Sequence, residues 1–212
     1  MPLQPHNTLT IALPKGRMSE ECVEYLHKKH VTSLKEFSKT SRKLIIQDKE
    51  KNIDFLLIRS QDVGTYVERG AADVGIIGGD LLRENEFAVY SAMELPFGYC
   101  ELCIAHPENL SNWDLRKHLR VATKYPKLTS HFFYSKGINA DLVKLYGSIE
   151  IAPITGISDI IVDLVSTGQT LKANKLIRSE PIMKSWANLV VNPSANQFKR
   201  ELISNLLNLL SK

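Results

Sequence analysis

The chain has 212 residues, of which 43% are hydrophobic and 24% are charged, so it can form one large domain or two small ones around a hydrophobic core. Its formal net charge of +4 does not require nucleic acid as a partner but suits small polyanionic substrates. There is no apolar run as long as a membrane span, and residues 1–7 do not resemble a signal peptide, so we expect a cytoplasmic protein that does not bind membranes.

Strand and helix signals alternate along the first half of the chain, which favours an α/β architecture. Short apolar runs predict the strands, and apolar residues with helical spacing predict the helices. The predicted strands are residues 8–13, 44–46, 53–58 and 73–77, and the predicted helices are residues 18–30, 60–68 and 81–85.

The second half begins with two extended segments and then continues the alternation. The extended segments are 87–95 and 97–105, the strands 119–123, 142–146, 175–183 and 187–191, and the helices 127–135, 156–165 and 194–210. We expect Ser194 and Gln197 to form a capping box on the last helix.

This order predicts two lobes with mixed, mainly parallel sheets. The second lobe, residues 93–185, would be inserted into a first lobe made of residues 1–92 and 186–212. Because the chain would cross twice between the lobes, we expect a hinge there and an active site in the cleft.

Metal and thiol chemistry have weak support in the sequence. Cys100 and Cys103 form a C-x-x-C, but in a strand their sulfurs would point to opposite faces and could not share a metal. None of the six histidines pairs with a plausible nucleophile. Buried thiols are the better interpretation, and the metal ligands stay unknown.

The stretch 163–171, Asp-Leu-Val-Ser-Thr-Gly-Gln-Thr-Leu, is the most informative part of the chain. Hydroxyl residues bracket one glycine, as in a tight turn that directs hydroxyls and free backbone N–H groups at a phosphate. The residues of this turn are Ser166, Thr167, Gly168, Gln169 and Thr170. An ordinary hydroxyl-capped joint between two helices is equally open.

Two carboxylates precede this turn. On the predicted helix 156–165, Asp159 and Asp163 lie one helical turn apart and share a face. Carboxylates that accept hydrogen bonds from a sugar diol, next to a phosphate site, indicate binding of a ribose 5-phosphate.

Further candidates lie at the ends of predicted strands, where ligands bind in open α/β sheets. Adjacent cations can clamp a pyrophosphate, small residues allow close backbone approach, and a lysine next to an aromatic residue suits a nucleotide. These candidates are Lys15, Gly16, Arg17, Arg42, Lys43, Arg59, Asp73, Lys124 and Tyr125. Solvated surface charges and structural turns are the alternatives for each of them.

Seven segments, in order along the chain, resemble the short form of the ATP phosphoribosyltransferase family, which catalyses the first step of histidine biosynthesis. The segments are 9–17, 41–44, 59–63, 67–76, 120–126, 144–148 and 156–174. The ordered set is far more specific than any one of them.

The resemblance implies a bilobed fold like type II periplasmic binding proteins and the activity of a pentosyltransferase, a class of glycosyltransferase. N1 of the ATP adenine would attack C1 of phosphoribosyl pyrophosphate and release pyrophosphate. It implies that Arg17 and Arg42 stabilise the leaving pyrophosphate with help from Lys15 and Lys43, and that Mg²⁺ neutralises it. The turn would hold the 5-phosphate, with Asp163 near the ribose.

The resemblance also implies partners. The long form of the family has an extra C-terminal regulatory domain, which we do not expect in this chain because it resembles the short form. The short form works as a homodimer of catalytic subunits, joined by a regulatory subunit similar to histidyl-tRNA synthetase in a hetero-octamer.

Two other functions stay open from the residues alone. One is a phosphoribosyltransferase for another base, and the other is a non-catalytic bilobed solute-binding module. Nucleic-acid binding is disfavoured because no basic stripe with interleaved aromatic residues is visible.

Overall fold

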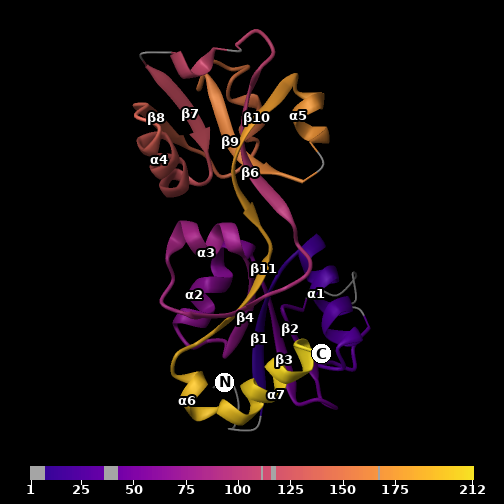
Figure 1. Cartoon of the computed structure of the whole chain (residues 1–212). Helices are drawn as coiled ribbons and strands as arrows, with labels where there is room; N and C mark the ends of the chain where they lie inside the picture. Colours follow the sequence, from indigo (N-terminus) through magenta and orange to yellow (C-terminus); the bar gives the residue numbers. More distant parts are fainter. Residues whose placement is uncertain (1–7, 36–42, 111, 116–117, 167) are drawn as a thin grey trace. The chain divides into compact units, whose positions relative to one another are not determined.

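The structure, a computed structural model, describes residues 8–35, 43–110, 112–115, 118–166 and 168–212. The chain forms two compact units, the first made of Met1–Gly98 with Trp186–Lys212 and the second of Tyr99–Ser185 (Figure 1). The boundary lies at residue 99, later than the predicted 93. This is because strand β5 pairs with strand β11 and so belongs to the first unit.

A six-stranded sheet forms the centre of the first unit, in the order β2-β3-β1-β4-β11-β5. Strand β1 lies between β3 and β4 and is parallel to both, whereas β2, β11 and β5 are antiparallel to their neighbours. The strands are β1 Leu9–Pro14, β2 Ile45–Asp48, β3 Ile53–Ile58, β4 Val74–Gly78, β5 Tyr90–Glu94 and β11 Ala187–Val191.

Helices α1 (Arg17–Lys28) and α7 (Arg200–Leu210) bury their apolar faces in one core with side chains of this sheet. The Tyr25 hydroxyl joins the two helices by donating to the carbonyl of Leu210 at 3.3 Å. Helix α2 (Val63–Glu68) packs closely on β4, since a side chain at Gly75 would meet Val67 at 2.7 Å. The short helices α3 (Gly79–Asn85) and α6 (Ala195–Phe198) complete the unit.

The second unit has a five-stranded sheet in the order β10-β6-β9-β7-β8. Strand β7 is parallel to β8 and β9, and β6 is antiparallel to β9 and β10. The strands are β6 Cys100–Pro107, β7 Leu119–Thr123, β8 Ala140–Lys144, β9 Ile160–Val165 and β10 Leu176–Ser185. Both described sheets are therefore mixed, as predicted, but parallel pairs are not the majority in either of them.

The second sheet is covered by helix α4 (Pro126–Ser135), whose Phe133 is buried and meets Trp113 edge to face at a centroid distance of 6.0 Å. The 3₁₀ turn η3 (Ile149–Ile151) and helix α5 (Gln169–Ala173) add to a separate core cluster with β6 and β9. That cluster includes Cys103, Ile161 and Leu171.

Among the helices that the structure describes, none has the length and apolar character of a membrane span.

The predicted helix 156–165 is wrong, because Ile160–Val165 is strand β9. Its apolar residues fit a helical spacing and a buried strand equally well. Ile160, Ile161 and Val162 are β-branched and fully buried, and such side chains pack well on a sheet.

The predicted helix 194–210 is divided into α6 and α7 at Lys199. The capping box does not form, since the Ser194 side chain makes no cap hydrogen bond. The Asn192 side chain performs this role instead, because its Oδ1 accepts a hydrogen bond from the N–H of Ala195 at 2.8 Å.

Candidate functional site

In the first unit, Lys15 and Arg59 lie at the same edge of the sheet. Each follows one of two parallel strands, β1 and β3, and the N–H of Lys15 donates to the carbonyl of Ile58 at 2.7 Å. Both residues are exposed. Gly16 between β1 and α1 has φ of 93° and open space where a side chain would lie, so a ligand can approach the backbone there.

Lys43 belongs to the same edge. It precedes β2, which is antiparallel to β3, and the N–H of Leu57 donates to the carbonyl of Leu44 at 2.8 Å. The structure thus brings Lys15, Lys43 and Arg59 to one edge of three adjacent strands, which we call the basic edge. Arg42 and Thr167 lie outside the described residues, as does the side chain of Arg17, and their predicted roles stay predictions.

Asp73 does not join this group, and its predicted contact with a ligand stays a prediction. It precedes β4 and therefore lies at the opposite edge of the sheet, where its Oδ2 accepts hydrogen bonds from the N–H of Thr10 and from Lys199 Nζ, both at 2.8 Å. Its carboxylate is occupied by internal partners.

In the second unit, a pocket of about 170 Å³ lies beside the predicted phosphate turn. Two half-buried carboxylates, Asp163 and Glu150, meet exposed hydroxyl residues there. The residues that line it are Glu150, Asp163, Leu164, Val165, Ser166, Gly168, Thr170 and Leu171. We call it the carboxylate pocket.

The strand β9 explains why Asp163 reaches this pocket. Asp163 shares a face of the sheet with Ile161 and Val165, which pack in the cluster that also contains residues of η3 and α5. Because Asp163 lies near the C-terminal end of β9, its carboxylate is beside the turn that begins at Ser166. This carboxylate accepts a hydrogen bond from the N–H of Leu164 at 2.8 Å.

The turn itself has the predicted geometry where it is described. Gly168 has φ of 73°, a left-handed conformation that favours glycine, and helix α5 begins at Gln169. The first N–H groups of a helix have no partners within it. Since α5 has only five residues, the donors offered to a ligand are individual N–H groups and the hydroxyls of Ser166 and Thr170.

The predicted helix would place Asp159 and Asp163 on one face, but in the structure Asp159 does not share the site with Asp163. It accepts hydrogen bonds from Arg120 through the backbone N–H at 2.8 Å, Nε at 3.4 Å and Nη2 at 3.1 Å. Hydrogen bonding to Asp159 raises the pKa of Arg120. This pair therefore fixes the start of β9 against β7.

Lys124 and Tyr125 differ in exposure. Lys124 is half-buried at the carboxyl end of β7, which is the edge at which β9 leads into the turn. The side chain of Tyr125 is only 1% exposed, so the structure does not present it at the surface, and its contact with a nucleotide stays a prediction. Its N–H donates to Thr123 Oγ1 at 2.9 Å and shapes the junction with α4.

The sequence does not predict Glu150 as a site residue. It lies in a 3₁₀ turn without any periodic pattern, and only the packing of η3 beside β9 brings it to Asp163. The sole local signal is its closeness to Gly147 and Ser148, which mark a turn.

The cysteines take no part in the site. Cys100 and Cys103 lie on β6, and burial raises the pKa of the Cys103 thiol. Within the described ranges there is no group of three or more His, Cys, Asp or Glu residues that could hold a metal ion.

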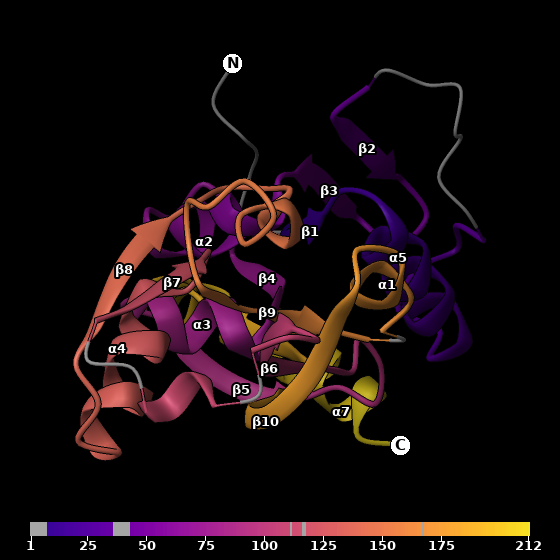
Figure 2. The same cartoon turned by 90° about the horizontal axis from the view of Figure 1, so that it is seen from above.

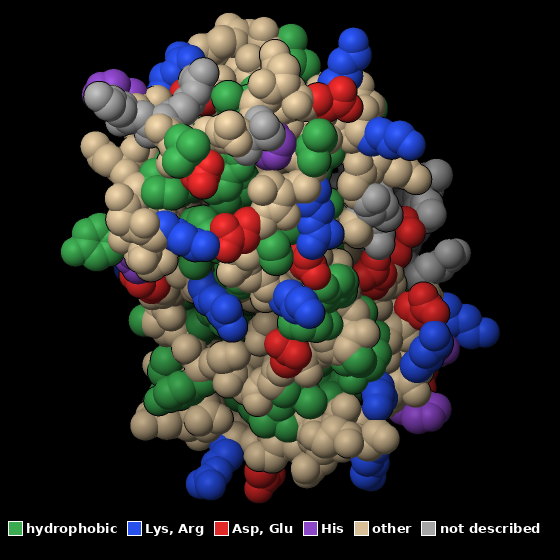
Figure 3. All heavy atoms as spheres, turned by 45° about the horizontal axis from the view of Figure 1, so that its top comes forward, with side chains coloured by type: hydrophobic (Ala, Val, Ile, Leu, Met, Phe, Trp, Pro, Cys, Tyr) green, Lys and Arg blue, Asp and Glu red, His purple; other side chains and the backbone are tan. Residues whose placement is uncertain are grey.

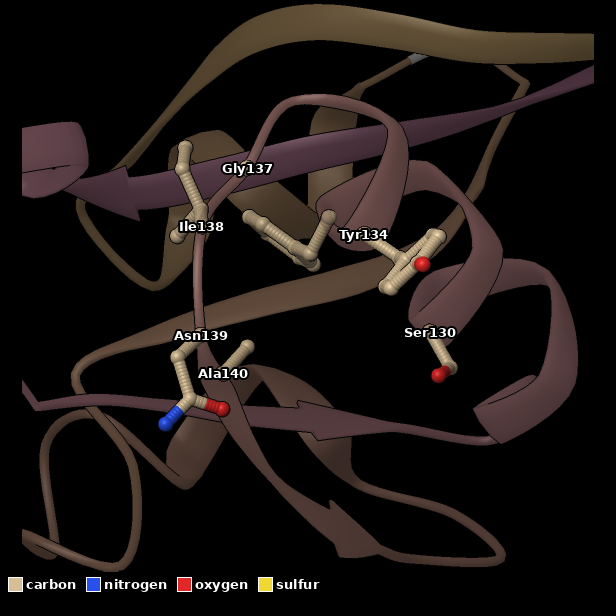
Figure 4. A pocket seen from close by; sticks show the side chains of 7 residues that line it. Ser130, Tyr134, Gly137, Ile138, Asn139 and Ala140 are labelled. Carbon is tan, nitrogen blue, oxygen red and sulfur yellow. The ribbon is translucent and has the colours of Figure 1, made fainter.

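Two further hollows lie on the second unit. One of about 300 Å³ is bordered by Ser130 and Tyr134 of α4 and by Asn139 before β8 (Figure 4). The other, of about 600 Å³, includes Pro107 and Ile154. Neither contains a residue predicted for the site.

On the face shown in Figure 3, basic and acidic side chains are interspersed over the described residues, so charge by itself does not mark a site there.

Comparisons with known proteins identify the family of the chain. A family model described as ATP phosphoribosyltransferase (HisG) matches residues 59–212. A curated ATP phosphoribosyltransferase from Leptospira biflexa is 49% identical over 205 residues, which cover 94% of this chain and 100% of that protein.

Two solved structures are similar in fold. The ATP phosphoribosyl transferase (HisG:HisZ) complex from Thermotoga maritima contains a chain with a TM-score of 0.80 and 35% identity, covering 96% of this chain and 97% of that one. A periplasmic binding protein from Brucella ovis, solved with glutathione bound, has a TM-score of 0.54 at 12% identity, covering 91% of this chain and 66% of that one. The second likeness concerns the fold alone. Since the family model and the relatives cover most of the sequence, the chain belongs to the ATP phosphoribosyltransferase family.

Proposed function

We propose that the carboxylate pocket binds the ribose 5-phosphate part of phosphoribosyl pyrophosphate. The turn that contains Ser166, Gly168 and Thr170 would hold the 5-phosphate through hydroxyls and N–H groups, and Asp163 and Glu150 would accept hydrogen bonds from the ribose hydroxyls. The observation that supports this most is the meeting of two carboxylates and the turn in one pocket of a member of this family.

The basic edge of the first unit suits the pyrophosphate group. Lys15, Lys43 and Arg59 are exposed cations at the ends of adjacent strands, and by the resemblance Arg17 and Arg42 join them. The lone pair of adenine N1 forms a bond to C1 of the ribose while the bond from C1 to the pyrophosphate oxygen breaks, and its electron pair leaves with pyrophosphate. Cations stabilise the negative charge that grows there. No general base is required, since N1 carries no proton near neutral pH.

The donor set of the carboxylate pocket also fits Mg²⁺. This ion is commonly bound by one or two carboxylates together with substrate phosphates, and Asp163 and Glu150 are carboxylates of that kind. When bound, Mg²⁺ would neutralise part of the charge of the pyrophosphate.

A regulatory partner is part of the proposal. The similar Thermotoga maritima chain was solved as a HisG:HisZ complex, and we expect this chain to form a homodimer that joins a regulatory subunit similar to histidyl-tRNA synthetase in a hetero-octamer. We also expect it to act in the cytoplasm, where ATP and phosphoribosyl pyrophosphate are available.

Paired serine variants test the 5-phosphate assignment. Ser166→Ala removes a hydroxyl from the turn, and Ser130→Ala removes an exposed hydroxyl from α4 in the same unit. We expect Ser166→Ala to raise the Kd for phosphoribosyl pyrophosphate, measured by titration calorimetry, about tenfold, and Ser130→Ala to leave it unchanged. Equal affinities in the two variants would disprove the assignment.

A further inference from the structure

Three parallel strands of the second unit end at one edge of its sheet. Strands β8, β7 and β9 are neighbours (Figures 1 and 2), and Thr123 at the end of β7 pairs with Lys144 of β8 and Val162 of β9. The turn after β9 begins at this edge, and Lys124 follows β7 there. Lys144, the last residue of β8, thus lies two strands away from the proposed 5-phosphate site.

Tyr146 is a large aromatic residue that the protein leaves open to solvent at this edge. It is 73% exposed, and Lys144 Nζ lies 5.4 Å from the centre of its ring. Leu145, between Lys144 and Tyr146, is held in place. Its N–H donates to the carbonyl of Thr123 at 3.0 Å, and its side chain packs against the core. The position of the backbone at Tyr146 is therefore well defined.

The chain that follows Tyr146 leads directly into the carboxylate pocket. Ser148 has φ of 50° and turns the chain, Ile149 is buried in the core, and Glu150 lines the pocket. Four residues span at most about 14 Å, so the exposed ring is tied closely to the pocket.

We propose that Tyr146 recognises the second substrate by stacking its ring on the adenine of ATP, with Lys144 and Lys124 as the cations nearest to the triphosphate. The proposal rests on the assignment of the 5-phosphate to the turn after β9. Two strand spacings, about 10 Å, separate the ends of β9 and β8, with β7 between them, so the two substrates can lie side by side at this edge of the sheet.

Stacking suits the chemistry of this reaction. A platform under the ring contacts only its face and leaves the N1 edge free to attack C1. An aromatic side chain also holds a base without occupying its hydrogen-bonding edge. The ammonium group of Lys144 lies over one face of the ring, which leaves the other face for the base, and adds attraction for a polyphosphate.

The first arm of the test measures the Kd for ATP by titration calorimetry in Tyr146→Ala and Tyr146→Trp. We expect Tyr146→Ala to weaken ATP binding about tenfold relative to the unchanged protein. Tyr146→Trp, which keeps an aromatic ring, should bind ATP as the unchanged protein does. Tyr134→Ala is the matched control, since Tyr134 is 86% exposed on α4 of the same unit. It should leave the affinity unchanged.

The second arm uses inorganic tripolyphosphate, which has no base. Tyr146→Ala should bind tripolyphosphate as the unchanged protein does, whereas Lys144→Ala should bind it several-fold more weakly. Equal losses for ATP and tripolyphosphate in Tyr146→Ala, or no loss for ATP, would overturn the proposal. Failure of the 5-phosphate assignment would appear separately, in the affinity of Ser166→Ala for phosphoribosyl pyrophosphate.

Discussion

Lys199 and Asp73 form an ion pair of 2.8 Å that joins the C-terminal helices to the starts of strands β1 and β4. Lys199 Nζ also donates to the carbonyl of Thr8 at 2.8 Å, and Asp73 Oδ2 also accepts the N–H of Thr10. One carboxylate and one ammonium therefore fix three segments that are far apart in the sequence. Both side chains are mostly buried, with exposed fractions of 16% and 12%.

We expect Asp73→Asn to lower the free energy of unfolding by about 2 kcal/mol, because it weakens charge-assisted hydrogen bonds and leaves an ammonium group without its partner. Urea denaturation measures this. Lys28→Met, which breaks the exposed pair with Glu24, should change stability by less than about 0.5 kcal/mol. An altered Kd for either substrate in Asp73→Asn would argue that the carboxylate binds a ligand after all.

A second prediction concerns the left-handed glycine of the turn. Gly168→Ala should cost about 1 kcal/mol of stability because φ is 73°, while the nearest atom to the new methyl group, Val165 Cγ1, is 3.9 Å away and does not clash. The strain should also distort the turn and raise the Kd for phosphoribosyl pyrophosphate. Gly137→Ala is the control, since Gly137 has φ of 70° with open space around it. If both variants lose the same affinity, the turn is not the phosphate site.

The sequence predicts a strand with the correct bounds where a segment is short, apolar and bounded by turn residues. Residues 53–58, 119–123 and 187–191 are strands with the predicted bounds. The sequence predicts a helix in place of β9 because a mostly buried strand shows no alternation, whereas its run of β-branched residues favours a strand.

The candidate site is only partly visible in the sequence, for a related reason. Local motifs identify the turn at Ser166 and the cations of the basic edge, since each directly follows or precedes a strand. They do not tell which side chains fold inward, as with Tyr125, or which distant turn packs beside a strand, as with Glu150. Those facts depend on tertiary packing.

A third prediction concerns acid stability. Asp48 is 2% exposed, and although burial raises its pKa, hydrogen bonds from Thr32, Ser33 and Lys51 together outweigh burial and lower it. A carboxylate with a lowered pKa stabilises the fold above the unfolded value of about 3.9, and this contribution is lost as the pH falls through the folded value.

The difference in free energy of unfolding between the protein and Asp48→Asn should therefore be constant from about pH 7 to 5 and shrink below about pH 4. Chemical denaturation across this range measures it. The exposed residue Asp62 provides the control variant, Asp62→Asn. A difference for Asp48→Asn that persists unchanged at the acid end would mean that the hydrogen bonds do not depend on the charge.

The last prediction concerns Glu150, which only the folded structure brings to Asp163. Glu150→Gln keeps the size of the side chain but removes the charge that would favour ribose hydroxyls and a magnesium ion. We expect its Kd for phosphoribosyl pyrophosphate in the presence of Mg²⁺ to rise about tenfold, with the Kd for ATP within twofold. Glu108→Gln, at an exposed carboxylate beside a different hollow of the same unit, should bind both substrates normally. If Glu150→Gln also bound normally, the second carboxylate would only support the turn η3, and Asp163 would be the one carboxylate of the pocket left to contact the ribose.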